Sequence, residues 1–238
     1  MESMSNKQQT SLLACQLKTT LLSPFQAVSL GTTVIVSDQL LMQSALIAAL
    51  DSKTEGQNLA SSSETDALNL LKSNAPTTLI CTPSLKKGCS INLARSAKEV
   101  DNISVILIIS SKSDLGFCSR MHDYCDVMLA EWDLDHGDKP LIRALEAIST
   151  KKETYHSPSI AGHLSYIQKH VAILTPREKS VLSLILNGSS NQDIADRLTI
   201  SPSTAKSYSR DVLRKLGTRN RHEAVVKGIK LGLLGDQP

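Results

Sequence analysis

Short apolar runs alternate with helix-like segments between Thr32 and about Thr150. The apolar runs predict strands at Thr33–Val36, Asn58–Ala60, Thr77–Cys81, Ser104–Ile109 and Val127–Leu129. The segments between and after them predict helices at Leu40–Leu50, Glu64–Lys72, Asn92–Val100, Gly116–His122 and Pro140–Ser149. Strands that alternate with helices form a parallel sheet covered on both faces. The pattern therefore predicts an α/β domain with the flavodoxin-like order of five strands.

A second pattern begins at Thr175 and is helical throughout. Thr175-Pro-Arg-Glu178 has the sequence of a capping box with proline at the first helical position, so it opens a helix that Gly188 ends. Further helices are expected at Asn191–Leu198, Ser201–Leu216 and Asn220–Leu231. The short turn between the second and third helices gives helix-turn-helix spacing.

The third of these helices has two different faces at a spacing of one hundred degrees per residue. One face is small or apolar and carries Ala205, Ser209, Val212, Leu213 and Leu216. The opposite face is hydroxylated and cationic and carries Ser203, Lys206, Ser207, Arg210 and Arg214. A helix of this kind can pack on its own domain with one face and enter a DNA major groove with the other.

These patterns divide the chain of 238 residues into four parts. The expected parts are an N-terminal extension (residues 1–31), an α/β domain (32–150), a linker (151–170) and an all-α four-helix domain (171–238). Leucines at i+4 spacing predict a short helix between residues 9 and 22 of the extension, which is either a partly ordered tail or a docking segment. A short helix is also expected in the linker, over Ser159–Gln168.

Basic charge is concentrated in the C-terminal quarter of the chain. Residues 1–174 carry 15 Lys and Arg against 17 Asp and Glu, and residues 175–238 carry 11 against 6. The net charges are therefore −2 and +5. This asymmetry favours a partner with phosphates for the helical domain. Aromatic residues make up only 3% of the chain, which argues against an aromatic-lined ligand cavity.

The cysteines are odd in number and contain no C-x-x-C pair; they are Cys15, Cys81, Cys89, Cys118 and Cys125. We therefore expect reduced thiols, no disulfide framework, no metal and no cofactor. Leu12-Leu13-Ala14-Cys15 resembles a bacterial lipoprotein cleavage site, but the polar residues 1–11 provide no hydrophobic signal core. No apolar run has the length of a membrane span, so we expect a cytoplasmic protein with no membrane partner.

The run Leu174–Gly228, LTPREKSVLSLILNGSSNQDIADRLTISPSTAKSYSRDVLRKLGTRNRHEAVVKG, closely resembles the LuxR/FixJ-type helix-turn-helix domain. In that family the third helix enters the major groove, the second braces it and the fourth commonly mediates dimerisation. By position, the resemblance implies base contacts for Lys206, Ser207 and Arg210. It implies phosphate or sugar contacts for Thr204, Tyr208 and Arg214, and we add Ser203 on the same face.

Phosphate neutralisation is expected to supply much of the affinity for double-stranded DNA. The cations assigned to this role are Lys206, Arg214, Lys215, Arg219 and Arg221. Ala205 and Ser209 stand where the family usually has valine. Because both lie on the inward face, the helix should be less firmly packed, by about 1–3 kcal/mol across the two sites.

The N-terminal half resembles a receiver domain of the response-regulator superfamily, which has a (β/α)5 fold. Val34–Asp38 resembles its first strand with an acidic end, and Thr78–Leu85 with Gly88 resembles the strand and loop around its phospho-acceptor. Val105–Ser110 resembles the fourth strand with its switch hydroxyl, and Cys125–Glu131 resembles the fifth.

The residues that receiver chemistry requires are replaced. An acceptor aspartate, an acidic pair for Mg²⁺ and a phosphate-binding lysine are all needed. Thr82 stands in place of the aspartate, Gln39 leaves Asp38 as the one acid of the pair, and Glu131 stands in place of the lysine. Met128 also replaces the usual aromatic switch. We therefore predict a degenerate pocket of Asp38, Gln39, Thr82, Ser110 and Glu131 that does not take phosphate from a histidine kinase by the usual route.

Several alternatives for control stay open. Cys81 lies beside the lost acceptor and is either a redox switch or, as cysteines in strands more often are, a small buried hydrophobe. Phosphorylation of Thr82 or Ser110 on oxygen is another route. Trp132 forms either a protein contact or edge packing.

The combined interpretation is a transcription regulator of the NarL/FixJ response-regulator type with a pseudo-receiver. It is expected to act as a homodimer that binds promoter or operator half-sites about one helical turn apart, and a regulatory protein partner is also considered. An interaction protein that uses the receiver-like fold to bind a partner, with DNA binding secondary, is the main alternative. No clustered Ser/His/Asp, Cys/His or Gly-rich phosphate loop supports an enzyme. The scarcity of aromatics argues against a small-molecule sensor of the autoinducer type.

Overall fold

The computed structural model describes residues 30–51, 56–100, 102–134, 140–150 and 154–233. The helix expected between residues 9 and 22 therefore lies outside the described residues. The described residues form two compact units, which meet along the chain between Ile160 and Ala161. The segment Leu115–Arg120 groups with the second unit.

The first unit is built on a parallel sheet whose strands run in the order β2-β1-β3-β4-β5-β6. The strands are β1 (Thr33–Val36), β2 (Asn58–Ser61), β3 (Thr78–Cys81), β4 (Ser104–Ile109), β5 (Val127–Ala130) and β6 (Tyr155–His156). The first five confirm the predicted flavodoxin-like order, and each lies within one residue of its expected bounds. The carboxyl ends of β1, β3, β4 and β5 consequently meet at one edge of the sheet.

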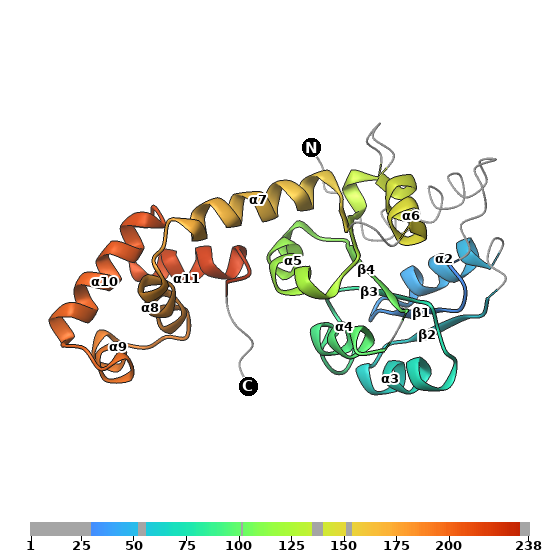
Figure 1. Ribbon diagram of the computed structural model, residues 1–238, viewed down its shortest axis with the longest axis horizontal. Helices are drawn as coiled ribbons and strands as arrows, with labels where there is room; N and C mark the ends of the chain where they lie inside the picture. Colours follow the sequence, from blue (N-terminus) through green and yellow to red (C-terminus); the bar gives the residue numbers. More distant parts are fainter. Residues whose placement is uncertain (1–29, 52–55, 101, 135–139, 151–153, 234–238) are drawn as a thin grey trace. The chain divides into compact units, whose positions relative to one another are not determined.

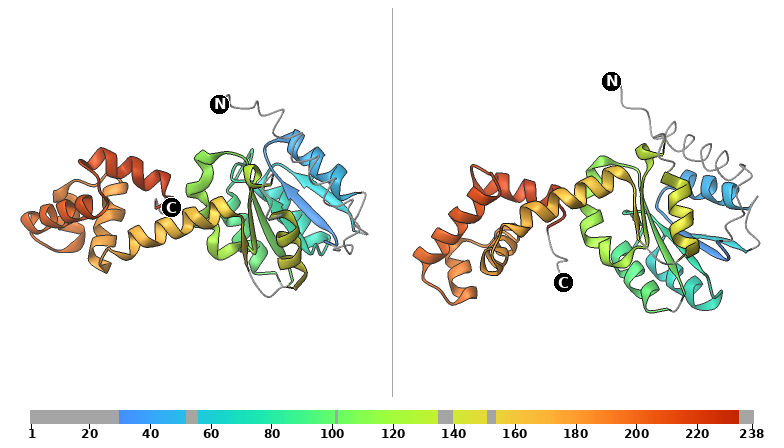
Figure 2. Two further views of the ribbon diagram at one scale, coloured as in Figure 1. Left: turned by 90° about the horizontal axis from the view of Figure 1, so that it is seen from above. Right: turned by 45° about the horizontal axis from the view of Figure 1, so that its top comes forward.

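Helices cover both faces of this sheet. Figure 1 and the right-hand view of Figure 2 show α2 (Leu40–Leu50) and α6 (Pro140–Thr150) on one face, and α3 (Glu64–Ser73) and α4 (Ser90–Lys98) on the other. One core cluster joins α2 and α6 to the strands through buried side chains that include Met42, Leu46, Ile80, Ile106, Leu129 and Ile148. The short helix α5 spans Leu115–Met121. This layered arrangement explains why β1, β3, β4 and β5 are buried at every residue, whereas the edge strand β2 is only partly buried.

The segment expected to be a linker has more regular structure than its sequence pattern indicated. β6 pairs with β5 through only two residues, Tyr155 and His156, which is too short to produce a periodic signal. Helix α7 then runs from Pro158 to Ala172, longer than the expected Ser159–Gln168. Tertiary hydrogen bonds rather than local sequence pattern fix the start of both elements.

The second unit contains four further helices, whose bounds lie within two residues of those predicted. They are α8 (Pro176–Leu186), α9 (Asn191–Leu198), α10 (Pro202–Lys215) and α11 (Arg221–Lys230). α10 packs on α8 and α9, and α11 packs on α8. At the α8–α11 contact Gly228 is required for close approach, since a Cβ there would lie 2.3 Å from Leu186 Cδ2.

Candidate DNA-binding surface and the altered receiver pocket

Helix α10 begins and ends as its sequence requires. The Ser201 side chain accepts a hydrogen bond from the Thr204 amide at 3.1 Å, and Pro202 occupies the first helical position, where no amide donor is needed. At the other end Gly217 adopts a positive φ of 64°, the conformation that terminates helices. The helix is therefore defined locally at both ends.

The inward face of α10 contains the residues that the periodicity placed there. Ala205, Ser209, Val212 and Leu216 are buried. Ser209 is not only a smaller substitute for valine, because its hydroxyl donates a 2.9 Å hydrogen bond to Asn191 Oδ1 on α9. A neutral hydrogen bond of this kind contributes about 1 kcal/mol, so it offsets part of the apolar contact that the smaller side chain lacks.

The outward face of α10 is open to solvent. Exposed side chains are those of Ser203, Thr204, Lys206, Ser207, Arg210 and Arg214, and Tyr208 is partly buried. These are seven of the eight residues predicted to contact DNA. The face thus combines donors for base edges with cations for phosphates on a single exposed helix.

The turn before α10 holds it at an angle to α9. Thr199 has a left-handed backbone (φ 53°, ψ 53°), and the Ile200 amide donates to the Ala195 carbonyl at 3.0 Å. α9 opens with a capping box in which Ser190 and Asp193 bond each other's backbone amides. Arg177 of α8 donates to the Leu198 carbonyl at 2.6 Å and so ties α8 to the end of α9.

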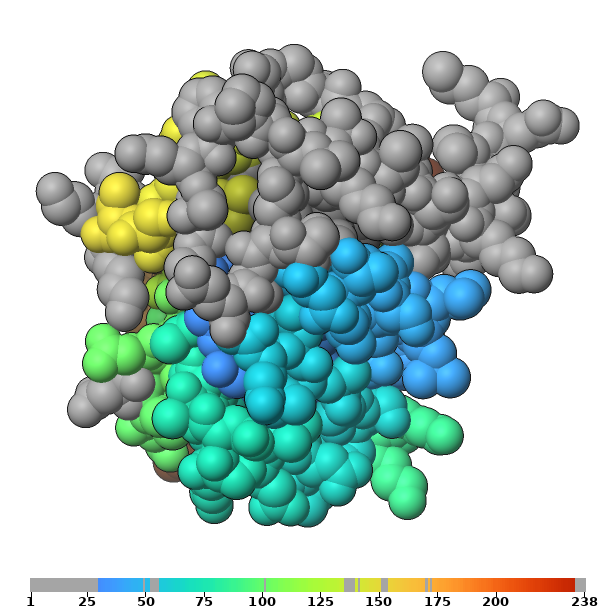
Figure 3. Space-filling view, turned by 90° about the vertical axis from the view of Figure 1, so that its right-hand side faces the viewer, coloured from blue at the N-terminus to red at the C-terminus, as the bar shows by residue number. Residues whose placement is uncertain are grey.

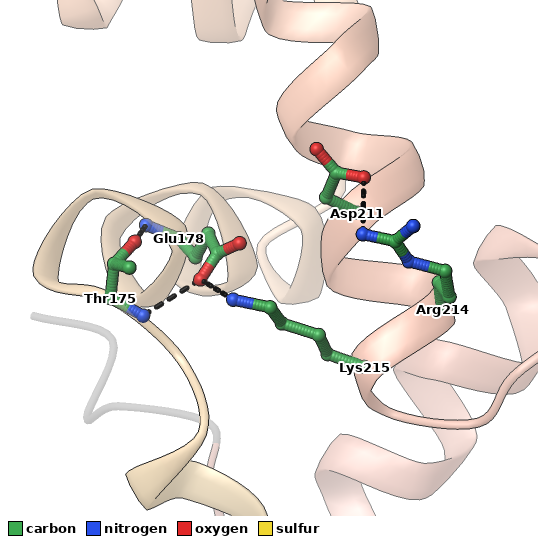
Figure 4. Close-up of polar contacts among 5 residues, drawn as sticks. All are labelled: Thr175, Glu178, Asp211, Arg214 and Lys215. Atoms are coloured by element: carbon green, nitrogen blue, oxygen red, sulfur yellow. Dashed lines mark hydrogen bonds and ion pairs between the residues drawn. The ribbon is translucent and has the colours of Figure 1, made fainter.

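Lys215, the eighth predicted DNA contact, has a partner inside the domain. Its Nζ lies 2.7 Å from Glu178 Oε2, and the Glu178 side chain is only 7% exposed (Figure 4). The same oxygen accepts the Thr175 amide at 2.7 Å and completes the capping box of α8. The hydrogen bond from Lys215 first, and that from the Thr175 amide second, hold the pKa of Glu178 below its usual value.

Two other cations differ in their engagement. Arg214 forms an exposed ion pair with Asp211 at 3.0 Å, one helical turn away (Figure 4). Such surface pairs are weak, so this arginine is available for a phosphate. Arg221 is half-buried and donates to the Ser189 carbonyl. The structure therefore separates cations that brace the domain from cations that face solvent.

In the first unit the predicted acceptor position is closed by hydroxyl groups. Thr82 is buried, and its hydroxyl lies 3.0 Å from Ser37 Oγ and 3.1 Å from the Ser84 carbonyl. Ser37 is the last residue before Asp38 and is also buried. Asp38 and Gln39 are exposed. The carboxyl ends of β1 and β3 are thus joined by a hydroxyl–hydroxyl contact directly before Asp38.

Gln43 and Ser90 complete this closure, and sequence reasoning missed both. The Gln43 amide donates to the carbonyls of Ser37 and Ser61 at 2.6 and 2.5 Å. The Ser90 hydroxyl donates to the Thr82 carbonyl at 2.7 Å from the start of α4. The available signal for Gln43 was its position, with Ser44, as one of two polar residues in an otherwise apolar helix.

Glu131 lies at the carboxyl end of β5 and is buried. Burial raises the pKa of this carboxyl, and a hydrogen bond with Ser110 at the end of β4 opposes that shift. Its Oε1 atom is buried without a hydrogen-bond partner. The structure therefore brings Ser110 and Glu131 together as a second pair, beside the pair formed by Ser37 and Thr82.

Cys81 adjoins this pocket and is fully buried. Burial raises the pKa of its thiol to about 12. Because the thiolate is the reactive form, the geometry favours the small buried hydrophobe over the redox switch.

Two further observations concern metal sites and membrane-spanning helices. Across the described ranges, no group of three or more His, Cys, Asp or Glu side chains is placed to hold a metal ion. No helix in the described part of the chain is both long and apolar enough to cross a membrane.

A groove of about 610 Å³ lies beside the edge strand β2. It is lined by residues of α2, β2 and α3, among them Leu40, Gln43, Ser61, Asp66 and Leu70. Next to it Leu40 and Leu41 expose 71% and 60% of their surface. Figure 3 shows this face of the unit, with α2 in blue and α3 in cyan to green.

The helical unit matches a known family. Residues 172–227 match the family model described as bacterial regulatory proteins, luxR family. The segment therefore belongs to that family, and its fold of four helices with the exposed face of α10 is a luxR-type helix-turn-helix domain.

Similar proteins carry names of bacterial regulators. The transcriptional regulatory protein DesR of Bacillus subtilis is 32% identical over 98 residues, which cover 41% of this chain and 47% of DesR. The nitrate/nitrite response regulator protein NarL of Escherichia coli is 38% identical over 68 residues, covering 29% of this chain and 32% of NarL. The chain thus spans less than half the length of these curated relatives.

Solved structures resemble the whole architecture. A structure of two RcsB dimers bound to two parallel DNAs has a TM-score of 0.61 at 21% identity, covering 84% of this chain and 98% of that one. RcsB from Salmonella enterica serovar Typhimurium bound to the rprA promoter has a TM-score of 0.59 at 19% identity, covering 85% and 99%. At this identity the likeness establishes the fold: a receiver-like α/β domain followed by a helical domain.

Proposed function

We propose that this protein is a DNA-binding transcriptional regulator that acts in the cytoplasm and reads operator DNA with α10. The observation that carries the proposal is the exposed cationic and hydroxylated face of a helix that is packed and capped within a luxR-type domain. Lys206, Ser207 and Arg210 are assigned to base edges, and Ser203, Thr204, Tyr208 and Arg214 to the backbone. Lys215 is assigned to the Glu178 brace.

The proposed active form is a homodimer. Val226 and Ile229 on α11 expose 52% and 53% of their surface, an apolar pair on the helix that commonly pairs chains in this family. The similarity to the structure of two RcsB dimers bound to two parallel DNAs supports the same arrangement. Two α10 helices would then reach half-sites about one helical turn apart.

A selection from randomised DNA, followed by affinity measurement on the selected operator, tests this function. Lys206→Ala and Arg210→Ala should each weaken binding by about tenfold or more, since a good base contact contributes about 1–3 kcal/mol. Lys72→Ala on α3 removes the same charge outside the domain and should stay within about twofold. Full operator affinity in both α10 variants would contradict the assignment.

We further propose that the receiver-like domain controls output without aspartyl phosphorylation. The hydroxyl contact between Ser37 and Thr82 occupies the acceptor position, and a threonine cannot form an acyl phosphate. Glu131 would repel a phosphoryl group where the family has lysine. Incubation with acetyl phosphate and Mg²⁺, beside a phosphorylatable receiver as positive control, should leave the protein unlabelled. Stable labelling at an aspartate is the contrary result.

The proposed domain boundaries remain residues 32–150 for the receiver-like domain and 171–238 for the helical domain, with the extension (1–31) and the connecting segment (151–170) outside both. β6 and the start of α7 lie in the connecting segment and pack with the first unit.

A regulatory protein partner is a second proposal, favoured by the exposed Leu40 and Leu41 beside the β2 groove. Pairs of large exposed apolar side chains at a groove are typical of interaction sites. Leu41→Glu should abolish copurification of a stoichiometric protein, whereas Gln192→Glu on exposed α9 should not. If no protein copurifies with the wild-type chain under native conditions, this second proposal is withdrawn.

A further inference from the structure

The first turn of α7 is held by side chains of the turn that follows β5. This turn is the three-residue 3-10 segment Glu131–Asp133. Asp133 is 2% exposed, and its two carboxylate oxygens accept both the amide and the hydroxyl of Ser159, at 2.8 and 2.5 Å. A carboxylate that accepts first-turn amides also complements the positive end of the helix. Asp133 therefore caps α7 from a distant part of the chain.

Neighbouring residues form further hydrogen bonds with the start of α7 and with Ser157 directly before it. Trp132 Nε1 donates to Ser159 Oγ at 3.0 Å. The Ala130 amide donates to the hydroxyl of the fully buried Ser157 at 3.0 Å. The Ser157 amide donates to the Met128 carbonyl at 2.9 Å and continues the pairing of β6 with β5. The start of α7 is thus bonded at successive positions to β5 and the turn beyond it.

The opposite side of the turn contacts the chain that leaves β4. Glu131 is hydrogen-bonded to Ser110, and Lys112 Nζ lies 6.0 Å from the centroid of the Trp132 ring. A cation at this distance from an indole face is attracted to it. Consecutive residues of one short turn therefore contact the end of β4 on one side and the first turn of α7 on the other.

We propose that the turn Glu131–Asp133 is a conformational relay that couples the Ser110–Glu131 corner of the altered receiver pocket to the start of helix α7. Three residues in one 3-10 turn cannot move independently, so displacement of Glu131 shifts Trp132 and Asp133 relative to Ser159. Glu131 Oε1 is buried without a hydrogen-bond partner, so hydrogen bonding holds the turn least firmly at this corner. Helix α7 leads directly into the DNA-binding domain, so the relay gives the receiver-like domain an output that needs no phosphoryl group.

Amide hydrogen exchange of the full-length protein tests the coupling without DNA. Ser110→Ala and Glu131→Ala change only the pocket side of the relay. Each is expected to raise exchange at residues 159–161 by about fivefold, the effect of weakening a helix cap by roughly 1 kcal/mol. Glu131→Gln keeps the length of the side chain and the hydrogen bond with Ser110, so exchange should remain within about twofold of wild type. Ser113→Ala, an exposed hydroxyl in the same loop, is the matched control.

Unchanged exchange at residues 159–161 in both Ser110→Ala and Glu131→Ala overturns the relay. If Glu131→Ala raises exchange throughout the sheet, the relay is tested with Trp132→Phe instead. This variant removes the indole N–H that donates to Ser159 and keeps an aromatic side chain. That variant should raise exchange at residues 159–161 at least twofold and leave exchange in β3 unchanged. No rise at residues 159–161 overturns the relay as well.

The consequence for DNA rests on the proposed function and is measured separately. Glu131→Ala is expected to change affinity for the selected operator by threefold or more, with Ser113→Ala again as control. A wild-type protein that binds no DNA contradicts the proposed function, while the exchange experiment still judges the relay. Altered exchange with unaltered operator affinity shows that the relay does not reach the output domain and overturns this consequence.

Discussion

At the residue scale, cations that are neighbours on α10 have different environments. Lys206 and Arg210 are exposed, whereas Lys215 bonds the buried carboxylate of Glu178. The periodicity of the helix places Lys215 at its end, but the partner lies 37 residues away on α8. Helical position could therefore be predicted from the sequence, and the tertiary partner could not.

Lys215→Ala should lower the thermal midpoint of the helical domain, because it leaves a largely buried carboxylate without its cation. It should leave the salt dependence of DNA binding unchanged. Arg214→Ala, which removes a cation assigned to the DNA backbone, should instead reduce the slope of log K against log salt by about 1 per chain. Circular dichroism melts and binding titrations at several salt concentrations measure both effects. The same loss of slope in the two variants would show that Lys215 contacts phosphate.

Cys81 and Cys89 provide a second comparison at this scale. With its thiol pKa raised to about 12, Cys81 should react with iodoacetamide at least about a hundredfold more slowly than the half-buried Cys89 at pH 8. Peptide mass mapping after short exposures measures both rates in one sample. Denaturant should equalise them, and rapid native modification of Cys81 would revive the redox hypothesis.

At the element scale, capping determines how the helical domain responds to acid. The pKa values of Glu178 and Asp193 are both lowered in the fold, the first chiefly by Lys215 and the second chiefly by the Ser190 side chain. A carboxyl with a lowered folded pKa contributes stability above its unfolded pKa of about 4 and loses it as pH falls through the folded value.

We therefore expect the domain to lose stability below about pH 4. Ser190→Ala should raise the pKa of Asp193 and leave that of Glu178 unchanged, as followed by carboxyl NMR titration. Lys215→Ala is the reciprocal variant and should raise only the pKa of Glu178. An unshifted Asp193 in Ser190→Ala would mean that the capping box does not operate in solution.

Two glycines on helices should respond to alanine with opposite signs. Gly228→Ala on α11 brings a Cβ against Leu186, which is buried and cannot easily move, so we expect a loss of about 1–3 kcal/mol. Gly162→Ala on α7 meets nothing within 4 Å and should gain about 0.5–1 kcal/mol from helix propensity. Urea unfolding measures both changes. A stabilising Gly228→Ala would show that α8 and α11 are less closely packed.

Most elements were predictable because their patterns are local. The strands and the helices of the second unit agree with apolar runs, capping residues and terminal glycines in the sequence. β6 and the full length of α7 were not predictable, because Ser157 and Ser159 bond β5 and the turn after it. In the pocket, the replacement of the acceptor aspartate by Thr82 was visible in the sequence. The closure of the pocket by Ser37 and Gln43 was not, because it depends on contacts between strand ends and a helix.

At the scale of the whole molecule, the salt dependence of DNA binding reports both the number of cations that contact phosphates and the number of chains bound. Of the five cations first assigned to phosphates, Lys215 and Arg221 are engaged inside the domain, which leaves Lys206, Arg214 and Arg219 in each chain. A dimer that uses all three should give a slope of log K against log salt of about −5, and a monomer about −3. Titrations combined with sedimentation distinguish these cases. A slope near zero would contradict electrostatic binding altogether.

The hydroxyl contact between Ser37 and Thr82 also has a historical consequence. Returning to an acyl-phosphate site would require an aspartate at Thr82, a second acid at Gln39 and a lysine at Glu131. The first change alone would bury a carboxylate against the hydroxyl of Ser37, and the last alone would remove the partner of Ser110. Recovery of phosphorylation therefore requires these substitutions together, because the single changes at Thr82 and Glu131 each disrupt a hydrogen bond of the present pocket.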